Sequence, residues 1–412
     1  YGRRHPGTRV RVEVLPVNGY ETWLRTQING DRSSGPDLYN ANYAWGLYEK
    51  GLVANLTPAV DNINPYTGKR WRETLSDPFL ERGKINGDIA LIPLDFIEIA
   101  FYYNKTHFDR LGLAPPRTWD EMLDVGKCLR KAGLVPFAVP GNADSYWGGA
   151  VGWISRFFSD AYLRPYLPRV MARPGDWDYD PVRNGRFRLN LNDPFNDSLV
   201  VVNPERNANL VRSGALRFDS PRFAEMYERI REFSTLWQRG FHGTSQQNAY
   251  HLFLSGHAGV YLDTSAAIGQ LLRDMDDLPR SARFPWGVFA VPPLTRSAFK
   301  IPAFRGVGGA GVMLSVVRKS DAQTKLSIDF LQFLTSPESI RVLVENALRH
   351  KRPLTGPMLV PGAPLPEAMQ AHFRAFEGKG FEKLTYRGLG DEQQSVWEWT
   401  AWAQRYMDGR IP

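Results

Sequence analysis

The sequence has almost no cysteine and no long uninterrupted apolar run. Cys128 is the single cysteine among 412 residues, so neither an internal disulfide nor a multi-cysteine metal or iron–sulfur site can form. The most apolar stretch, residues 88–103, is interrupted by Asp95 and Glu98, whereas a membrane-spanning helix needs about 20 apolar residues. The sequence therefore predicts neither a disulfide scaffold nor a transmembrane helix.

Charge of one sign is also not concentrated anywhere. The chain has 51 Lys plus Arg against 43 Asp plus Glu, a net charge of +8, but its densest basic patch is only Arg3-Arg4-His5. Proteins that bind nucleic acid carry clustered basic residues, so we expect no nucleic-acid partner. Apolar residues make up 43% of the chain, which is ordinary for a globular protein, and the length suggests two or three domains.

Motifs for nucleotide or metal chemistry are nearly absent. Residues 306–311 match G-x-G-x-x-G, but a strand pattern follows them where a dinucleotide site needs a helix. We interpret this segment as a tight loop beside a ligand or a sheet edge. Asp176, Asp178 and Asp180 alternate as in half a calcium loop, yet Pro181 stands where the loop needs glycine, which favours a solvated acidic loop over a calcium site. No metal ligand and no cofactor are predicted.

Helix predictions rest on capping residues. Thr118 with Glu121 forms a capping box for a helix that should end at Gly133. Ser220 precedes a helix with a 3.6-residue apolar period that should reach Gly240. Two more helices should begin after Ser320 and Ser336.

Strand predictions rest on alternation and short apolar runs. Val10, Val12 and Val14 alternate with charged residues and predict a strand with one buried face. Further apolar strand candidates lie at residues 89–101, 259–262, 286–291 and 311–317. Strands that alternate with helices indicate an α/β fold with mainly parallel sheets. Residues 160–215 show little periodicity and are expected to be an irregular insertion.

Aromatic residues are abundant: 12 Trp, 17 Tyr and 23 Phe. Several stand in predicted loops, beside Asn or Asp at residues 40–45 and 142–147 and beside Glu398 at residues 395–399. Aromatic faces next to amides and carboxylates suit sugars, whose C–H faces stack and whose hydroxyls form hydrogen bonds. Most of the rings, however, are expected to be core residues.

The order of several short segments resembles the family 1 extracellular solute-binding proteins of bacterial ABC importers, the maltose-binding-protein-like group. The matching segments are Gly35–Leu38, Gly51–Leu56, Asn86–Pro93, Tyr102–Lys105, Leu111–Glu121, Phe253–Ala258, Gly287–Pro293 and Phe330–Ser336. Each motif alone is weak, but together they follow the family's order over nearly the whole chain.

This resemblance implies a two-lobed α/β architecture of the type II periplasmic-binding-protein (Venus-flytrap) class, with a ligand cleft between the lobes. Lobe one would comprise residues 1–108 and 290–336, and lobe two residues 109–289 and 337–412. Ligand binding would close the cleft by hinge motion. The family begins with a strand and a helix before the segment that resembles residues 1–7, so we expect about two dozen residues of the family pattern to be missing from lobe one.

The resemblance also implies ligand contacts. On lobe one they are polar residues after the Gly35–Leu38 segment, a weaker candidate after residues 92–93, and a glycine turn at the cleft. On lobe two they are an acidic and aromatic segment, a polar residue after a strand, and an aromatic residue near the last helix. The predicted ligand-binding residues are Asn40, Asn42, Tyr43, Asp95, Gly308 and Gly309, and then Asp144, Tyr146, Trp147, Asp263 and Trp397. Ala266 stands where many members carry a stacking Trp.

The function that the resemblance implies is capture of a mono- or oligosaccharide and its delivery to the membrane subunits of an ABC permease, without enzymatic activity. The protein would be a monomer in the periplasm or on the extracellular face of the membrane, where a lipid anchor is an open alternative. Ala266 motivates a second hypothesis, a polar non-sugar ligand such as a polyol, a polyamine or a phosphorylated metabolite. A carbohydrate-active enzyme is a more distant alternative.

Overall fold

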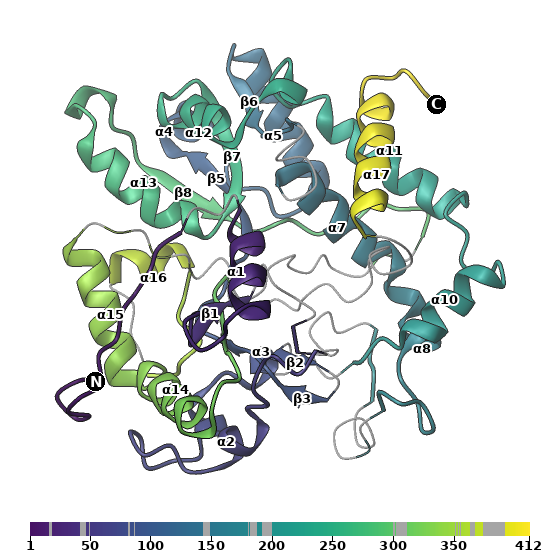
Figure 1. The fold of residues 1–412 in the computed structure, drawn as a ribbon. Coiled ribbons are helices and arrows are strands. Elements are labelled where there is room, and N and C mark those ends of the chain that lie inside the picture. The colour runs from purple at the N-terminus through teal and green to yellow at the C-terminus, as the bar shows by residue number, and fades with distance from the viewer. Residues whose placement is uncertain are drawn as a thin grey trace. The chain divides into compact units, whose positions relative to one another are not determined.

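The computed structural model describes residues 1–412 except 16–18, 42–46, 49, 81, 82, 86, 143–148, 180, 182–187, 192–199, 300, 302–310, 351, 353, 355, 363–366 and 374–391. The chain divides into two compact units. Unit 1 comprises Tyr1–Ile97 and Gly309–Glu367, and unit 2 comprises Glu98–Gly308 and Ala368–Pro412. Each unit is therefore built from separated stretches of chain (Figure 1).

Unit 1 contains a sheet with the strand order β1-β9-β4. β1 (Leu38–Asn40) and β4 (Ile92–Pro93) both pair antiparallel with β9 (Met313–Val316), which lies far along the chain. β2 (Lys84–Ile85) and β3 (Asp88–Ile89) form a separate hairpin. The helices of this unit are α1 (Tyr20–Asn29), α2 (Thr57–Asp61), η2 (Trp71–Thr74), α3 (Asp77–Leu80), α14 (Asp321–Leu334) and α15 (Pro337–Arg349).

The core of unit 1 joins helix α1 to the sheet. Leu24 and Ile28 lie one turn apart on α1 and are fully or almost fully buried. They belong to one apolar cluster with Tyr39 of β1 and Met313 of β9. Since positions four residues apart share a helix face, one side of this short helix is sufficient to cover the sheet here.

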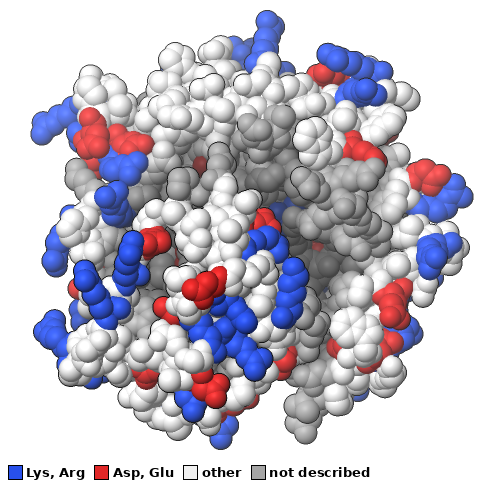
Figure 2. All heavy atoms as spheres, in the orientation of Figure 1, with Lys and Arg blue, Asp and Glu red and all other residues white. Residues whose placement is uncertain are grey.

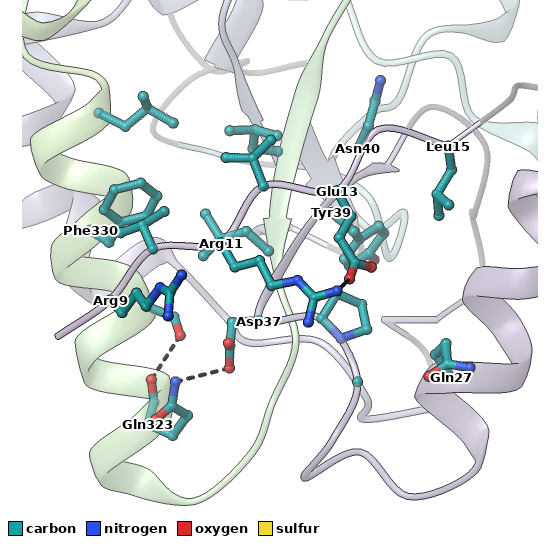
Figure 3. A pocket seen from close by; sticks show the side chains of 18 of the residues that line it. Arg9, Arg11, Glu13, Leu15, Gln27, Asp37, Tyr39, Asn40, Gln323 and Phe330 are labelled. Atoms are coloured by element: carbon teal, nitrogen blue, oxygen red, sulfur yellow. Dashed lines mark hydrogen bonds and ion pairs between the residues drawn. The ribbon is translucent and has the colours of Figure 1, made fainter.

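The predicted strand at Val10–Val14 is wrong. Residues 8–15 form no strand, and Val12 and Val14 are 79% and 92% exposed. This segment borders a cavity of about 950 Å³ that β1 and the α14 side chains Leu326 and Phe330 also line (Figure 3). Alternation fits a sheet only when a neighbouring strand supplies ladder hydrogen bonds. No strand that the structure describes pairs with this segment.

Unit 2 contains a sheet with the strand order β6-β7-β5-β8. Its strands are β5 (Ile99–Asn104), β6 (Val135–Ala138), β7 (Ala258–Thr264) and β8 (Trp286–Phe289). Its helices are α4 (Lys105–Leu111), α5 (Trp119–Lys131), α7 (Ala150–Leu163), η4 (Arg164–Tyr166), α8 (Leu167–Val170), α10 (Pro204–Arg212), α11 (Pro221–Ser234), η5 (Phe241–Gly243), α12 (Gln246–Leu254), α13 (Ala266–Asp277), η6 (Arg280–Ala282), α16 (Glu367–Phe373), whose first residue still belongs to unit 1, and α17 (Glu392–Met407).

The expectation of mainly parallel sheets is wrong for the described strands. Among them only β6 and β7 pair in parallel, and a helical crossover joins these two strands. β5 lies between β7 and β8 and runs antiparallel to both. Alternation of strands and helices along the chain indicates the α/β class, but it does not show which strands become neighbours.

An aromatic cluster forms the centre of unit 2. Trp119 at the start of α5 packs edge-on against Phe233 of α11, with ring centroids 5.0 Å apart. Phe233 also packs against Phe137 of β6 at 4.9 Å. All three side chains are fully buried, so this cluster ties two helices to the sheet.

The capping predictions are confirmed at three helices. The Thr118 hydroxyl accepts a hydrogen bond from the Glu121 amide at 3.2 Å, and Ser320 and Ser336 cap α14 and α15 in the same way. Helix α11 begins as predicted after Ser220 but ends at Ser234, six residues before the predicted Gly240.

The stretch expected to be irregular, residues 160–215, contains α8 and α10. Helix α10 forms because the Asn203 side chain accepts a hydrogen bond from the Arg206 amide at 2.8 Å and Pro204 occupies the first turn. The units also differ from the expected lobes in their bounds. Residues 98–108 and 290–308 belong to unit 2, and residues 337–367 belong to unit 1.

The described surface carries mixed charges. On the face seen in Figure 2, basic and acidic side chains are interspersed, in agreement with the spread of charge along the sequence. Within the described ranges, no helix combines the length and the apolar character that a membrane span requires.

Candidate functional site

Two predicted site residues of unit 1, Asn40 and Asp95, lie at the same end of strand β9. Asn40 is the last residue of β1 and pairs with Leu314, which pairs on its other side with Ile92 of β4. Asp95 follows β4 by two residues, and its Oδ1 accepts a hydrogen bond from the Val312 amide at 2.6 Å. The antiparallel register therefore brings both residues to the point where β9 begins.

Asp95 is a buried carboxylate, only 2% exposed. Burial raises its pKa to about 6, although hydrogen bonds from the Val312 and Gly311 amides oppose that rise. A Cβ at position 311 would lie 2.4 Å from Ile97 Cδ1 and 3.0 Å from Asp95 Oδ1. A larger residue there would therefore require the Ile97 side chain to move.

Asp263 lies near the end of strand β7 in unit 2, as the sequence indicated. Its Oδ1 accepts a hydrogen bond from the Thr264 amide at 2.6 Å, and its Oδ2 accepts one from the Tyr261 hydroxyl. Burial raises the pKa of Asp263, and the hydrogen bond from Tyr261 is the largest effect that opposes the rise. The carboxylate is therefore held in a fixed orientation near the carboxyl end of strand β7.

A network of polar side chains around Asp263 was missed by the sequence analysis. Gln246, the first residue of α12, donates its side-chain amide to the Tyr261 hydroxyl at 2.7 Å. The Tyr102 hydroxyl of β5 donates to the Thr264 carbonyl at 2.5 Å. Tyr261 could have been found, because residues two apart on a strand share a face. Gln246 and Tyr102 could not, since only long-range packing brings them here.

The loop after β6 leads to the same edge of the unit 2 sheet. Ala138 of β6 pairs in parallel with Tyr261, and the Asn142 amide donates to the Thr244 carbonyl at 3.2 Å, just before α12. Asn142 directly precedes the segment that holds three predicted site residues. The described chain before that segment therefore ends near the end of β7 at which Asp263 lies.

Trp397 lies on helix α17, so the loop predicted for residues 395–399 is wrong, and its ring is 74% exposed. Its helix lies beside α11 (Figure 1), and the Trp399 indole donates to the Tyr227 hydroxyl at 3.4 Å. Arg231 of α11 stacks over the Tyr406 ring at 5.1 Å. These contacts leave the ring of Trp397 accessible on a helix that is itself anchored.

The other predicted site residues lie outside the described residues. They are Asn42, Tyr43, Asp144, Tyr146, Trp147, Gly308 and Gly309. The described end of the glycine motif, Gly311, is followed by strand β9 as predicted, so a helix does not open there.

The Asp176 carboxylate, which was considered as half of a calcium loop, forms an ion pair with the Arg206 side chain. The Asp176 carboxylate accepts two hydrogen bonds from Arg206, at 2.7 and 2.9 Å, and Asp178 accepts one from the Asn203 side chain. Among the described residues no group of three or more acidic, histidine or cysteine side chains could hold a metal ion. Asp180 lies outside these residues.

A family model described as bacterial extracellular solute-binding protein matches residues 1–353 of the chain. The multiple sugar-binding protein of Streptococcus mutans is 29% identical over 144 residues, which are 34% of this chain and 31% of that protein. The melibiose/raffinose/stachyose-binding protein of Bacillus subtilis is 23% identical over 216 residues, 51% of this chain and 45% of that protein. The chain therefore matches less than half the length of either curated relative.

The fold is similar to that of solved structures. A family 1 extracellular solute-binding protein from Bifidobacterium longum subsp. infantis superposes with a TM-score of 0.64 and 17% identity, over 100% of this chain and 90% of that one. With the two α/β units, this similarity confirms the expected fold class, the two-lobed architecture of the solute-binding proteins.

Proposed function

We propose that this chain, which belongs to the bacterial extracellular solute-binding proteins, captures a mono- or oligosaccharide and delivers it to the membrane subunits of an ABC importer. The family is one of extracellular proteins. From the family resemblance we propose that residues of both units contact the ligand and that binding is accompanied by hinge motion. The protein would act as a monomer, either free in the periplasm or held at the extracellular face of the membrane by a lipid anchor.

The observation that carries this proposal is that two of the similar curated proteins are named as sugar-binding proteins. Both curated relatives described above are named for sugars, although their sequences match different shares of the chain. The proposal is for binding alone, without an enzymatic step and without a cofactor.

The proposed contacts combine polar and aromatic side chains from the two units. Carboxylates and amides form hydrogen bonds with sugar hydroxyls, and exposed rings stack on the C–H face of a pyranose. On unit 1 we propose Asn40, Asn42, Tyr43 and Gly309, and on unit 2 Asp144, Tyr146, Trp147, Asp263, Gly308 and Trp397. Asp95, the weaker candidate on unit 1, is buried and bound to backbone amides. The fixed carboxylate of Asp263 and the exposed ring of Trp397 support the roles of these two residues.

A thermal-shift screen against mono- and oligosaccharides at millimolar concentration tests the proposal. A sugar present at 100 times its dissociation constant stabilises the folded state by about 2.7 kcal/mol, which gives a clear rise in the unfolding temperature. Mannitol, spermidine and glucose 6-phosphate serve as comparison ligands. Stabilisation by none of the sugars would contradict the proposal.

Ala266 supports the alternative, a polar non-sugar ligand. It is the first residue of α13, and the family resemblance implies a stacking Trp at this position. The variants Trp147→Ala and Trp397→Ala separate the two proposals. Sugar affinity should fall strongly in both, whereas a small charged ligand should bind both variants as it binds the wild type.

A further inference from the structure

Asp95 lies where the chain passes between the two units. The chain leaves unit 1 after Ile97, returns to it at Gly309 and leaves it again after Glu367. Asp95 stands two residues before the first of these crossings, and Val312 stands three residues after the second. The hydrogen bond from the Val312 amide to Asp95 thus joins two crossover segments close to their ends.

The backbone around Asp95 repeats this connection. The Leu94 amide donates to the Val312 carbonyl at 2.9 Å, so both the amide and the carbonyl of Val312 are bound by neighbouring residues of one segment. Gly311 lies against this connection, and a Cβ there would require the Ile97 side chain to move. The first two crossover segments are therefore fastened by the hydrogen bonds that Asp95 accepts from the Val312 and Gly311 amides and by one backbone hydrogen bond.

The opposite edge of the Asp95 segment binds the stretch that leads to the third crossing. The Phe96 amide donates to the Pro357 carbonyl at 2.9 Å, and the Leu359 amide donates to the Leu94 carbonyl at 2.8 Å. Asp95 itself forms a bridge with Met358. Residues 94–96 consequently lie between the other two segments and contact both.

We propose that Asp95 is a positioning residue that holds these three segments in register, and that it affects sugar binding through them and not by contacting the sugar. This inference rests on the proposed function and replaces the direct contact that the family resemblance implied for Asp95. Its side chain is almost completely buried, and its Oδ1 is directed at the Val312 amide. A buried carboxylate bound to backbone amides stabilises the segments that carry those amides.

Amide hydrogen exchange in the ligand-free protein tests the fastening without any sugar. Asp95→Ala should speed exchange of the Val312 amide by about tenfold or more, and it should also speed exchange of Leu359 on the opposite edge. Asp95→Asn should leave both rates near the wild-type values, because its Oδ1 still accepts a hydrogen bond. Unchanged exchange at Leu359 in Asp95→Ala would overturn the claim that Asp95 holds all three segments.

Ser315→Ala is the matched control. Ser315 is fully buried on β9 and its hydroxyl donates to the Ala90 carbonyl at 2.8 Å. The variant therefore removes side-chain hydrogen bonding on the strand that follows Val312, away from the crossings. In this variant, the hydrogen-exchange rate of the Val312 amide and the affinity for sugar should both match those of the wild type.

Sugar affinity, measured by titration calorimetry with whichever saccharide stabilises the wild type, tests the second half of the inference. Asp95→Ala should weaken binding by about tenfold or more, and Asp95→Asn should restore it. Loss of affinity in Asp95→Asn with wild-type exchange would show direct contact with the sugar and overturn the positioning role. Wild-type affinity in Asp95→Ala would overturn it as well. If the wild type binds no sugar, the proposed function is contradicted. The hydrogen-exchange experiment still tests whether Asp95 holds the three segments together.

Discussion

The Tyr261 hydroxyl donates a hydrogen bond to Asp263, two positions further along strand β7. Gln246 donates in turn to the Tyr261 hydroxyl, so the orientation of the proposed ligand-binding carboxylate depends on residues that do not themselves need to touch the ligand. A hydrogen bond to a charged group contributes about 1.5–3 kcal/mol.

Tyr261→Phe is therefore expected to weaken sugar binding by about tenfold or more without removing any proposed contact residue. The variant also removes the largest effect that opposes the rise in the pKa of Asp263, so the carboxyl should titrate at a higher pH than in the wild type. Calorimetric titrations over a series of pH values measure both effects. Unchanged affinity and an unchanged pH profile would mean that Asp263 needs no support from Tyr261.

The buried carboxyl of Asp95 makes a contribution to stability that depends on pH. Its pKa rises from 3.8 to about 6 on folding, so the folded state binds the proton more tightly than the unfolded state. This contribution is present in full below the unfolded pKa and is lost as the pH rises through about 6, a change of about 3 kcal/mol.

Asp95→Asn isolates this effect because asparagine does not titrate. Denaturant unfolding of both proteins between pH 4 and 8 should show the wild type losing stability relative to the variant as the pH rises. A difference between the two proteins that stays constant over this range would contradict the raised pKa.

The exposed valines near the amino terminus offer a test of the fold of unit 1. Val12 and Val14 are 79% and 92% exposed, so Val12→Ser and Val14→Ser should each change the free energy of unfolding by no more than about 0.5 kcal/mol. Val260→Ser, at a fully buried position of β7, is the contrasting control and should be severely destabilising. A loss of more than about 1 kcal/mol at Val14 would mean that this segment is packed in solution.

The aromatic core of unit 2 should be the most sensitive region to truncation. Phe233 is fully buried and contacts the rings of Trp119 and Phe137. Phe233→Ala should lower the free energy of unfolding by about 3–5 kcal/mol, measured by denaturant titration. Phe218→Ala, whose ring is 40% exposed, should lose much less. Equal losses in the two variants would contradict the assignment of the core.

Local signals in the sequence predicted local structure well. Thr118, Ser320 and Ser336 each cap a helix as predicted, because a cap needs only a side chain and an amide three residues away. Val10–Val14 failed because a strand also needs a partner, which alternation does not provide. The antiparallel pairing of β9 with β1 and β4 joins residues more than 200 positions apart, and no local pattern contains that information.

In the candidate site, too, local features could be predicted from the sequence and long-range contacts could not. The family resemblance proposed Asp263, which lies near the end of β7, whereas the hydrogen bond from Gln246 to Tyr261 depends on how α12 packs on the sheet. Asp95 was predicted as a ligand contact, and its bond to Val312 was not foreseeable because 217 residues separate the two. Sequence reasoning thus identified chemically suitable residues but not the side chains that orient them.

The most direct test of the central claim is calorimetric titration of the wild-type protein with raffinose and other oligosaccharides. We expect saturable binding of at least one sugar with one site per chain, together with loss of that binding in Asp263→Ala. Absence of binding to every sugar, or saturable binding of spermidine or glucose 6-phosphate in place of a sugar, would contradict it.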